Sequence, residues 1–267
     1  PLPPPAEPAG AAVLEAPVGT KFFSGMTRSP KRLREALRAG EPVGVSVLSV
    51  DRRRGNLRII SDTILDLISQ AAEQGIPVFV DSGAFGLYDN NIDMPWDEVR
   101  SQYLRILEEV AQQFRSNLYF VAPDVVGDIK GSIDALVDND WVEFDLIRQG
   151  ARVIYPVPME KGKSFEESQV EVSSAADIQW GTNSNQRIIG VPFNKAAWSE
   201  EAIVEWVSED KDFREKNPDP DAPPGATFPR IHLLGGGKAA VKSLAEKLNE
   251  IEPTITVTGD STRQRER

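Results

Sequence analysis

The feature that most constrains the fold is a repeated alternation of short apolar runs with amphipathic segments. Apolar, β-branched runs cover residues 43–50, 76–80, 118–122, 151–157, 187–191, 230–235 and 253–259. Helical patterns fill most intervals between them, as at residues 62–74, where apolar side chains recur at roughly i, i+3, i+4, i+7. Such alternation predicts right-handed βαβ units around a parallel sheet. Because seven or eight repeats fit a closed barrel better than an open sheet, we predict an α/β fold, a TIM-like (β/α)8 barrel.

Local signals set the expected boundaries of this domain. Residues 1–19, rich in Pro, Ala and Gly, predict a flexible leader, and residues 20–267 predict one barrel domain. Within it, the charged and Pro-rich residues 210–227 predict a surface loop or insertion. Ser29-Pro30 and the capping-box spacing of Ser164 and Glu167 mark two helix starts. Since seven residues follow Asp260, we expect an incomplete final element, missing, supplied by a partner or borrowed from the N-terminus.

The composition and charge of the chain exclude some kinds of site and disfavour some partners. The chain has no cysteine, which excludes disulfides, thiolate nucleophiles and cysteine-built zinc sites. No window approaches 18 uninterrupted apolar residues and no secretory signal is visible, so we expect no membrane partner and a cytoplasmic location. The net charge of −11 opposes nucleic-acid binding on average. Basic residues nevertheless concentrate between residues 21 and 58, and such a patch either binds phosphates or forms a solvated helix face.

Carboxylates recur where the predicted strands end, at Asp51, Asp81, Asp124 and Asp260. In a barrel all four would point toward the same C-terminal face, where barrel enzymes carry their chemistry. One such aspartate could merely cap a turn, but four favour a catalytic or ligand-binding cluster whose members separate into acid, base and nucleophile. Two hydrolytic interpretations remain open: glycosyl chemistry between paired carboxylates, or oxygen ligation of a divalent metal.

Two further features are less specific. His232 stands alone inside an apolar run, which is more typical of a core histidine than of a metal ligand, and we expect neither a metal nor a cofactor. Gly235-Gly236-Gly237-Lys238 precedes a predicted helix but lacks the Walker spacing. A phosphate or backbone contact at these glycines remains open, because late βα loops of barrels often bind phosphate, whereas nucleotide hydrolysis is not expected.

Five short motifs, in their order along the chain, resemble those of the tRNA-guanine transglycosylases. They are Asp81-Ser82-Gly83-Ala84-Phe85-Gly86, Ala122-Pro123-Asp124-Val125-Val126, Ile188-Ile189-Gly190-Val191, His232-Leu233-Leu234-Gly235-Gly236-Gly237 and Gly259-Asp260-Ser261-Thr262. The resemblance spans about residues 20–262 and implies base exchange at a glycosidic bond of a nucleic acid. It implies Asp260 as nucleophile, Asp81 in proton transfer and base binding, and Asp124 as acceptor from a guanine-type edge. It also implies substrate contacts from Ser82, Gly83, Phe85, Gly190, Gly235 and Gly236, although Phe85 could equally be a core aromatic. Apart from the resemblance, the basic residues Arg52, Arg53, Arg54, Lys238 and Arg263 are candidate nucleic-acid contacts.

The chain also departs from that family. Ala84 and Gly86 stand where the family has glycine and glutamine, Val157-Pro158-Met159-Glu160 replaces a Gln-Gly element, and the three-Cys, one-His zinc site is absent. These departures favour the DNA 7-deazaguanine transglycosylase branch, with DNA rather than tRNA and a 7-deazaguanine base as partners, in a homo-oligomer or with a partner subunit. Three alternatives remain open: a non-catalytic base- or nucleic-acid-binding relative, a tRNA-acting transglycosylase, or an unrelated carboxylate-dependent barrel hydrolase.

Overall fold

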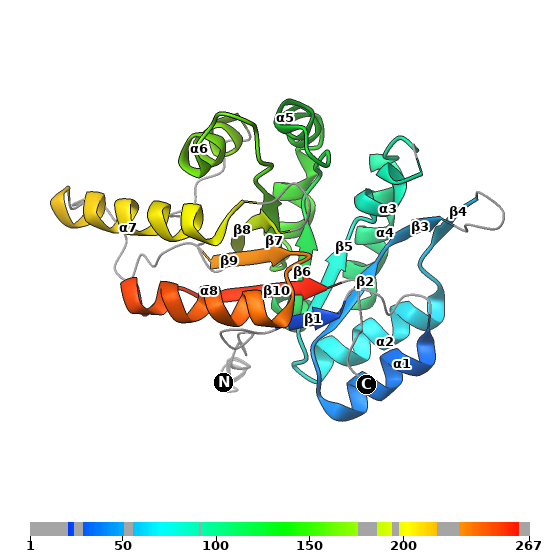
Figure 1. Ribbon diagram of the computed structural model, residues 1–267. Helices are drawn as coiled ribbons and strands as arrows, with labels where there is room; N and C mark the ends of the chain where they lie inside the picture. Colours follow the sequence, from blue (N-terminus) through cyan, green and yellow to red (C-terminus); the bar gives the residue numbers. More distant parts are fainter. Residues whose placement is uncertain are drawn as a thin grey trace, which may run out of the picture.

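Figure 1 shows the computed structural model of the chain, in which helices surround a curled parallel sheet. The structure describes residues 21–23, 29–50, 56–90, 92–175, 186–193, 198–217 and 230–261. The strands of the sheet are β1 (Lys21–Phe23), β2 (Val43–Ser46), β5 (Val78–Asp81), β6 (Leu118–Val121), β7 (Arg152–Pro156), β8 (Arg187–Pro192), β9 (Arg230–Leu234) and β10 (Val257–Ser261).

These strands pair in the order β1-β10-β9-β8-β7-β6-β5-β2, and the order closes on itself. Every pairing is parallel, so the predicted TIM-like fold is confirmed. The short strand β1 closes the ring, pairing along its length with β10 and through Phe23 and Val43 with β2. The closing element is therefore borrowed from the N-terminus, one of the three alternatives. No helix follows β10 within the described residues, so the last βα unit is incomplete there.

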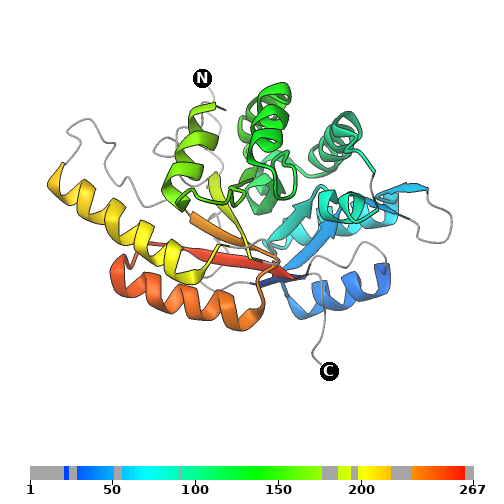
Figure 2. The same cartoon turned by 45° about the horizontal axis from the view of Figure 1, so that its top comes forward.

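The helical layer consists of α1 (Pro30–Ala39), α2 (Asp62–Glu73), α3 (Ala84–Tyr88), α4 (Trp96–Glu109), α5 (Ile129–Asp138), α6 (Phe165–Ala175), α7 (Glu200–Lys216) and α8 (Lys238–Ile251). A 3₁₀ helix, η2 (Gln112–Asn117), and a π-helix, η3 (Val142–Ile147), complete it. Helices α7 and α8 pack against each other, and Figure 2 shows both on the same side of β9 and β10. This arrangement is expected of βαβ units that return each strand to the same sheet.

Some predicted boundaries differ from the observed ones. The run at residues 43–50 is two strands, because β2 stays in the barrel while β3 (Leu48–Val50) pairs antiparallel with β4 (Leu57–Ile59) in a separate two-stranded sheet. Figure 1 shows this hairpin projecting from the barrel. Helix α7 continues to Lys216, into the segment expected to be an insertion, and residues 218–229 lie outside the described part of the chain, as does the expected leader at residues 1–19.

The predicted helix starts are confirmed by their hydrogen bonds. Ser29 Oγ accepts from the Arg32 amide at 3.3 Å, and Pro30 occupies the first turn of α1, where its missing N–H removes no intrahelical bond. At the start of α6, the Ser164 amide donates to the Glu167 carboxylate at 2.7 Å and the Glu167 amide donates to Ser164 Oγ at 3.1 Å. This reciprocal pair is the capping box that the sequence predicted.

Side chains alternate between the barrel interior and the helical layer. Val78 and Val80 of β5 pack with the helices, whereas Phe79 between them joins Tyr119, Val121, Ile154 and Ile188 in a small cluster inside the barrel. This period of two is the geometry of a strand. Asp81 therefore shares the inward face of Phe79, and Asp260 shares that of Thr258.

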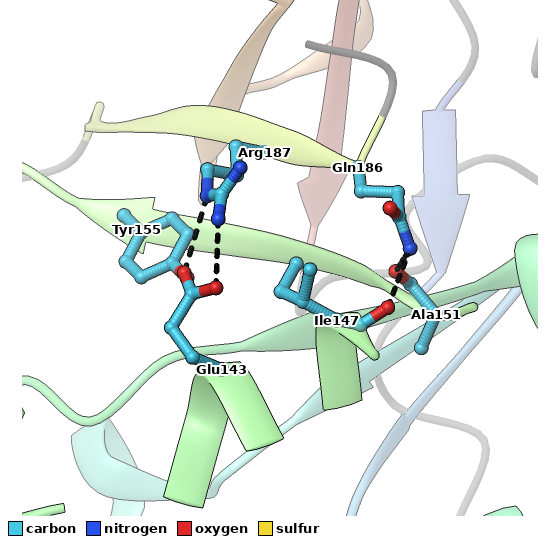
Figure 3. Close-up of polar contacts among 6 residues, drawn as sticks. All are labelled: Glu143, Ile147, Ala151, Tyr155, Gln186 and Arg187. Carbon is cyan, nitrogen blue, oxygen red and sulfur yellow. Dashed lines mark hydrogen bonds and ion pairs between the residues drawn. The ribbon is translucent and has the colours of Figure 1, made fainter. Parts of the chain in front are cut away.

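A polar network fastens η3 to the outside of the barrel (Figure 3). Glu143 accepts two hydrogen bonds from Arg187, at 3.1 and 2.7 Å, and one from the Tyr155 hydroxyl at 2.8 Å. At the other end of η3, the Gln186 side chain donates to the Ile147 and Ala151 carbonyls at 2.8 and 3.0 Å. The network thus links the segment preceding β7 to both β7 and β8.

We expect the substitution Arg187→Met to lower the free energy of unfolding by roughly 2 kcal/mol, between the costs of losing an exposed and a buried ion pair, because Arg187 is the bidentate partner of a partly buried carboxylate. The Arg187 side chain is 10% exposed and that of Glu143 is 34% exposed. The matched control is Arg100→Met, which breaks the ion pair between Arg100 of α4 and Asp145 of η3. The Arg100 side chain is 46% exposed, so this change should cost less than about 1 kcal/mol. Urea denaturation of both variants measures the two costs, and equal losses would contradict the expectation.

Candidate functional site

Three of the four strand-end aspartates come together at the carboxyl end of the barrel, called the mouth below. Asp81 is the last residue of β5, Asp124 is the third residue after β6, and Asp260 lies near the end of β10. Because these strands are parallel, their carboxyl ends share one face. The fourth, Asp51, lies outside the described residues, and it follows β3 of the hairpin rather than a barrel strand.

Asp81 occupies the centre of this group. The Ser46 hydroxyl, directly opposite on β2, donates to Asp81 Oδ2 at 2.7 Å. Burial raises the pKa of Asp81 to about 6, the Ser46 hydrogen bond opposes the rise, and the charge of Asp260 adds to it. Backbone groups of Gly83 and Ser82 also oppose the rise. Asp81 therefore changes protonation near neutral pH, which suits a group that exchanges protons.

Asp124 titrates at a still higher pH. Burial raises its pKa to about 7, and the charge of Asp81 adds to the effect. The residue as a whole is partly exposed to solvent. Tyr103 of α4 marks the same neighbourhood, because burial and then the charges of Asp81 and Asp124 raise the pKa of its phenol well above the usual value. The Tyr103 hydroxyl donates to the Val121 carbonyl at 2.8 Å, which ties α4 to the end of β6.

Asp260 is the most buried of the three, at 5% exposure. Its Oδ1 accepts a hydrogen bond from the Gly235 amide at 2.8 Å and lies 3.5 Å from His232 Nε2. The Gly235 amide, one of the positions expected to contact a phosphate or substrate, is thus directed at Asp260. The charge of Asp260 raises the pKa of Asp81, and the charge of Asp81 raises that of Asp124, so the three carboxyl groups interact in the order Asp260, Asp81, Asp124.

The corner after Asp81 is shaped by close packing. Ser82 is fully buried and its Oγ accepts from the Ala84 amide at 3.2 Å, so its hydroxyl serves the turn. Gly83 has a φ of +93°, and a Cβ there would lie 2.4 Å from the Leu48 carbonyl oxygen. A side chain at this position is therefore excluded both by backbone conformation and by the hairpin packed against it.

We expect Gly83→Ala to destabilise the protein by at least about 2 kcal/mol, since it adds both left-handed strain and a clash with a backbone oxygen. Gly86→Ala is the matched control three residues later in the same motif. Its Cβ would meet nothing within 4 Å inside α3, and alanine favours a helix. Thermal unfolding should separate the two variants, and a neutral Gly83→Ala would show that the approach of Leu48 is less tight than described.

The remaining predicted contact residues divide into three groups. Phe85 is 48% exposed on α3, so it is not a core aromatic, and its contact with substrate stays a prediction. Gly190 and Gly236 are packed so closely that a Cβ would lie 2.9 Å from Ile154 Cγ2 and 2.8 Å from Leu233 Cβ, respectively. Lys238 begins α8 and its side chain is not described, and Arg52, Arg53, Arg54 and Arg263 lie outside the described residues. Their contacts with nucleic acid stay predictions.

The sequence does not identify two residues, Ser46 and His232, that the structure places at the site. Ser46 lies inside the valine-rich run at residues 43–50, in which nothing marks the end of a barrel strand. His232 was predicted to be a core residue, and it is fully buried, but its ring lies beside Asp260. The alternation of side chains along β10 places Thr258 on the same inward face as Asp260. Since Thr258 pairs with His232 of the neighbouring strand β9, this register brings His232 close to Asp260.

In the described part of the chain we also looked for metal sites, membrane-spanning helices and cavities away from the mouth. No group of three His, Asp or Glu side chains there could hold a metal ion, and no helix there is long and apolar enough to cross a membrane. A cavity of about 300 Å³ lies between α1 and α2, and Arg34, Arg38, Asp66 and Gln70 are among its lining residues. None of the three aspartates lines it, so we place the site at the mouth, where the perturbed carboxyl groups are.

The fold and the site define the class of this protein as a TIM-like α/β barrel with interacting carboxylates at its mouth. No family model and no curated protein matches the chain. Among solved structures, the chain is similar to an endo-1,4-β-D-mannanase from Thermotoga petrophila RKU-1, at 10% identity over 92% of this chain and 88% of the other, with a TM-score of 0.43. A xylose isomerase domain containing protein from Salmonella typhimurium LT2 gives 11% identity, 92% and 90% coverage, and a TM-score of 0.41.

Lysine decarboxylase from Selenomonas ruminantium is similar at 14% identity and a TM-score of 0.38, and the match spans 91% of this chain but about half, 54%, of the decarboxylase. These similarities concern the fold. They correct the expected assignment to the tRNA-guanine transglycosylases, with its DNA- or tRNA-modifying activity, its 7-deazaguanine substrate and its pentosyltransferase class, because the matched structures carry other activities and no family model supports it. The physical reason lies in the motifs, whose glycines 83, 190 and 236 are required by local packing in this barrel.

Proposed function

We propose that the protein is a carboxylate-dependent hydrolase that cleaves glycosidic bonds at the mouth of its barrel. The observation that carries this proposal is the graded set of carboxyl groups: the pKa of Asp124 is raised to about 7 and that of Asp81 to about 6, beside a third carboxylate, Asp260. Glycosidic cleavage needs one carboxylic acid that is still protonated near neutral pH and a second, negatively charged carboxylate. The mouth supplies both kinds of group.

The geometry suggests a role for each residue. Asp124 is the general acid, which protonates the leaving-group oxygen, because it retains its proton to the highest pH. Asp260 is the carboxylate that faces the positive charge developing on the sugar, and the Gly235 amide holds its Oδ1. Asp81 lies between them electrostatically, so a change in its protonation adjusts both neighbours. Ser46 fixes one oxygen of Asp81.

A panel of p-nitrophenyl glycosides and reduced oligosaccharides tests the proposal. We expect release of p-nitrophenol from at least one sugar, with a bell-shaped pH profile whose limbs fall near pH 6 and pH 7, where Asp81 and Asp124 titrate. Proton NMR of the first product formed then assigns retention or inversion. Absence of turnover across the panel by a folded protein would overturn the assignment. So would turnover of the oligosaccharides that Asp124→Asn leaves unchanged, since their leaving groups depart as alcohols and need a proton.

A further inference from the structure

His232 is the single histidine of the chain, and the proposed roles leave it unused. It is fully buried inside the barrel. Its Nδ1 lies 2.8 Å from Thr258 Oγ1, and its Nε2 lies 3.5 Å from Asp260 Oδ1. The ring stacks on Phe79, with centroids 5.0 Å apart and planes 8° from parallel. The ring plane and both nitrogens are therefore fixed by three neighbours from two other strands.

The partners of the two nitrogens decide which one carries the proton. A neutral imidazole has one donor and one acceptor nitrogen, and an ionised carboxylate can only accept. The nitrogen that faces Asp260 must therefore be the donor, which is Nε2. Nδ1 is then the acceptor, and the Thr258 hydroxyl, which can rotate to donate, matches it. The opposite tautomer would direct a lone pair at the carboxylate, which is repulsive in a buried site.

Both donors converge on the same oxygen of Asp260. The Gly235 amide reaches Oδ1 at 2.8 Å, and His232 Nε2 faces that atom as well. Within the described part of the chain, Oδ2 accepts no hydrogen bond. One oxygen is thus held by the protein while the other remains for a substrate. The 3.5 Å separation is long for a hydrogen bond, as is common at catalytic groups before substrate binds.

We propose that His232 is a positioning residue which, as the Nε2–H tautomer, holds Asp260 Oδ1 and leaves Asp260 Oδ2 directed at the substrate. Asp260 selects the tautomer, the Thr258 hydroxyl donates to Nδ1, and Phe79 fixes the ring plane. The use made of Oδ2 rests on the proposed hydrolase function, whereas the tautomer and the His232–Asp260 contact do not. The two can therefore be tested separately.

The first experiment needs no substrate. In ¹⁵N-labelled protein, a long-range ¹H–¹⁵N correlation spectrum contains the imidazole signals of one residue, so both nitrogens are assigned without ambiguity. At neutral pH we expect a protonated Nε2 in the wild type and in Thr258→Val, and loss of this preference in Asp260→Ala. An unprotonated Nε2 in the wild type, or an imidazole spectrum that Asp260→Ala does not change, would overturn the proposal.

The second experiment uses two amide side chains. Glutamine places its amide nitrogen near the position of Nε2, and asparagine places its own near Nδ1. We expect His232→Gln to keep kcat within about tenfold of the wild type and His232→Asn to lose about 10²-fold, the usual cost of one directed donor, with KM little changed in both. Equal losses in two variants with wild-type melting temperatures would contradict positioning. If no glycoside is turned over at all, the hydrolase proposal fails while the NMR result still decides the role of His232.

Discussion

Replacement of Asp260 by alanine should lower kcat for glycoside hydrolysis by about 10³-fold, within the range expected when a positioned acid, base or charged group is removed. The loss should appear in kcat more than in KM, because the positive charge that Asp260 faces develops only in the transition state. Steady-state kinetics on the best substrate of the glycoside panel measures both constants. A variant that retains the wild-type rate would remove Asp260 from the mechanism.

Two controls separate this chemical loss from a structural one. Asp260→Asn keeps the acceptor for the Gly235 amide but removes the negative charge, so it should lose nearly as much activity as Asp260→Ala while melting closer to the wild type. Asp66→Ala removes an exposed aspartate on α2 and should leave the rate unchanged. In Asp260→Ala, added formate or azide should restore part of the activity, since a small anion can occupy the space that the carboxylate leaves.

The sequence predicted the parts of this site that follow from strand periodicity. An apolar run that ends in an aspartate marks a strand end, and parallel strands bring such ends to one face, so the sequence alone groups Asp81, Asp124 and Asp260. The helix starts at Ser29 and Ser164 were equally visible, because side-chain capping is a local interaction.

What the sequence could not show depends on contacts between distant segments. The break at Val47, which makes Ser46 a strand end, arises where the chain leaves the barrel to form the hairpin, and the continuous strand-like pattern of residues 43–50 gives no sign of it. The importance of His232 depends on register with β10, which pairs Thr258 with His232 across 26 positions.

The assignment to the transglycosylases is wrong for a related reason. Short motifs built from an aspartate and glycines recur wherever a barrel strand ends in a tight corner. Gly83 is needed because Leu48 approaches it, and Gly190 because Ile154 and Pro156 do. A matching glycine therefore indicates that the backbone is closely packed at that position. It indicates a shared substrate only when the side chains that contact the substrate also match. Here the glutamine expected in the first motif is Gly86.

The acidic mouth should also make the stability of the protein depend on pH. The pKa values of Asp81 and Asp124 are raised to about 6 and about 7 in the folded state, above the value of about 4 in an unfolded chain. The folded state therefore binds protons more tightly than the unfolded state. Its stabilisation by these protons is fully present below about pH 4 and is lost as the pH rises through about 6 and 7.

Asp124→Asn should remove most of this loss, because the amide resembles the protonated acid and carries no charge at any pH. We expect the variant to exceed the wild type in free energy of unfolding by about 2–4 kcal/mol at pH 8, and by close to nothing at pH 4. Urea denaturation at pH 4, 6 and 8 measures the difference, with Asp66→Asn as the exposed control that should follow the wild type throughout. If Asp124→Asn follows the wild type as well, Asp124 is not held in the buried, charge-coupled environment on which its role as an acid depends. A variant that is more stable at high pH and also inactive would instead indicate that the protein trades stability for a functional carboxyl group.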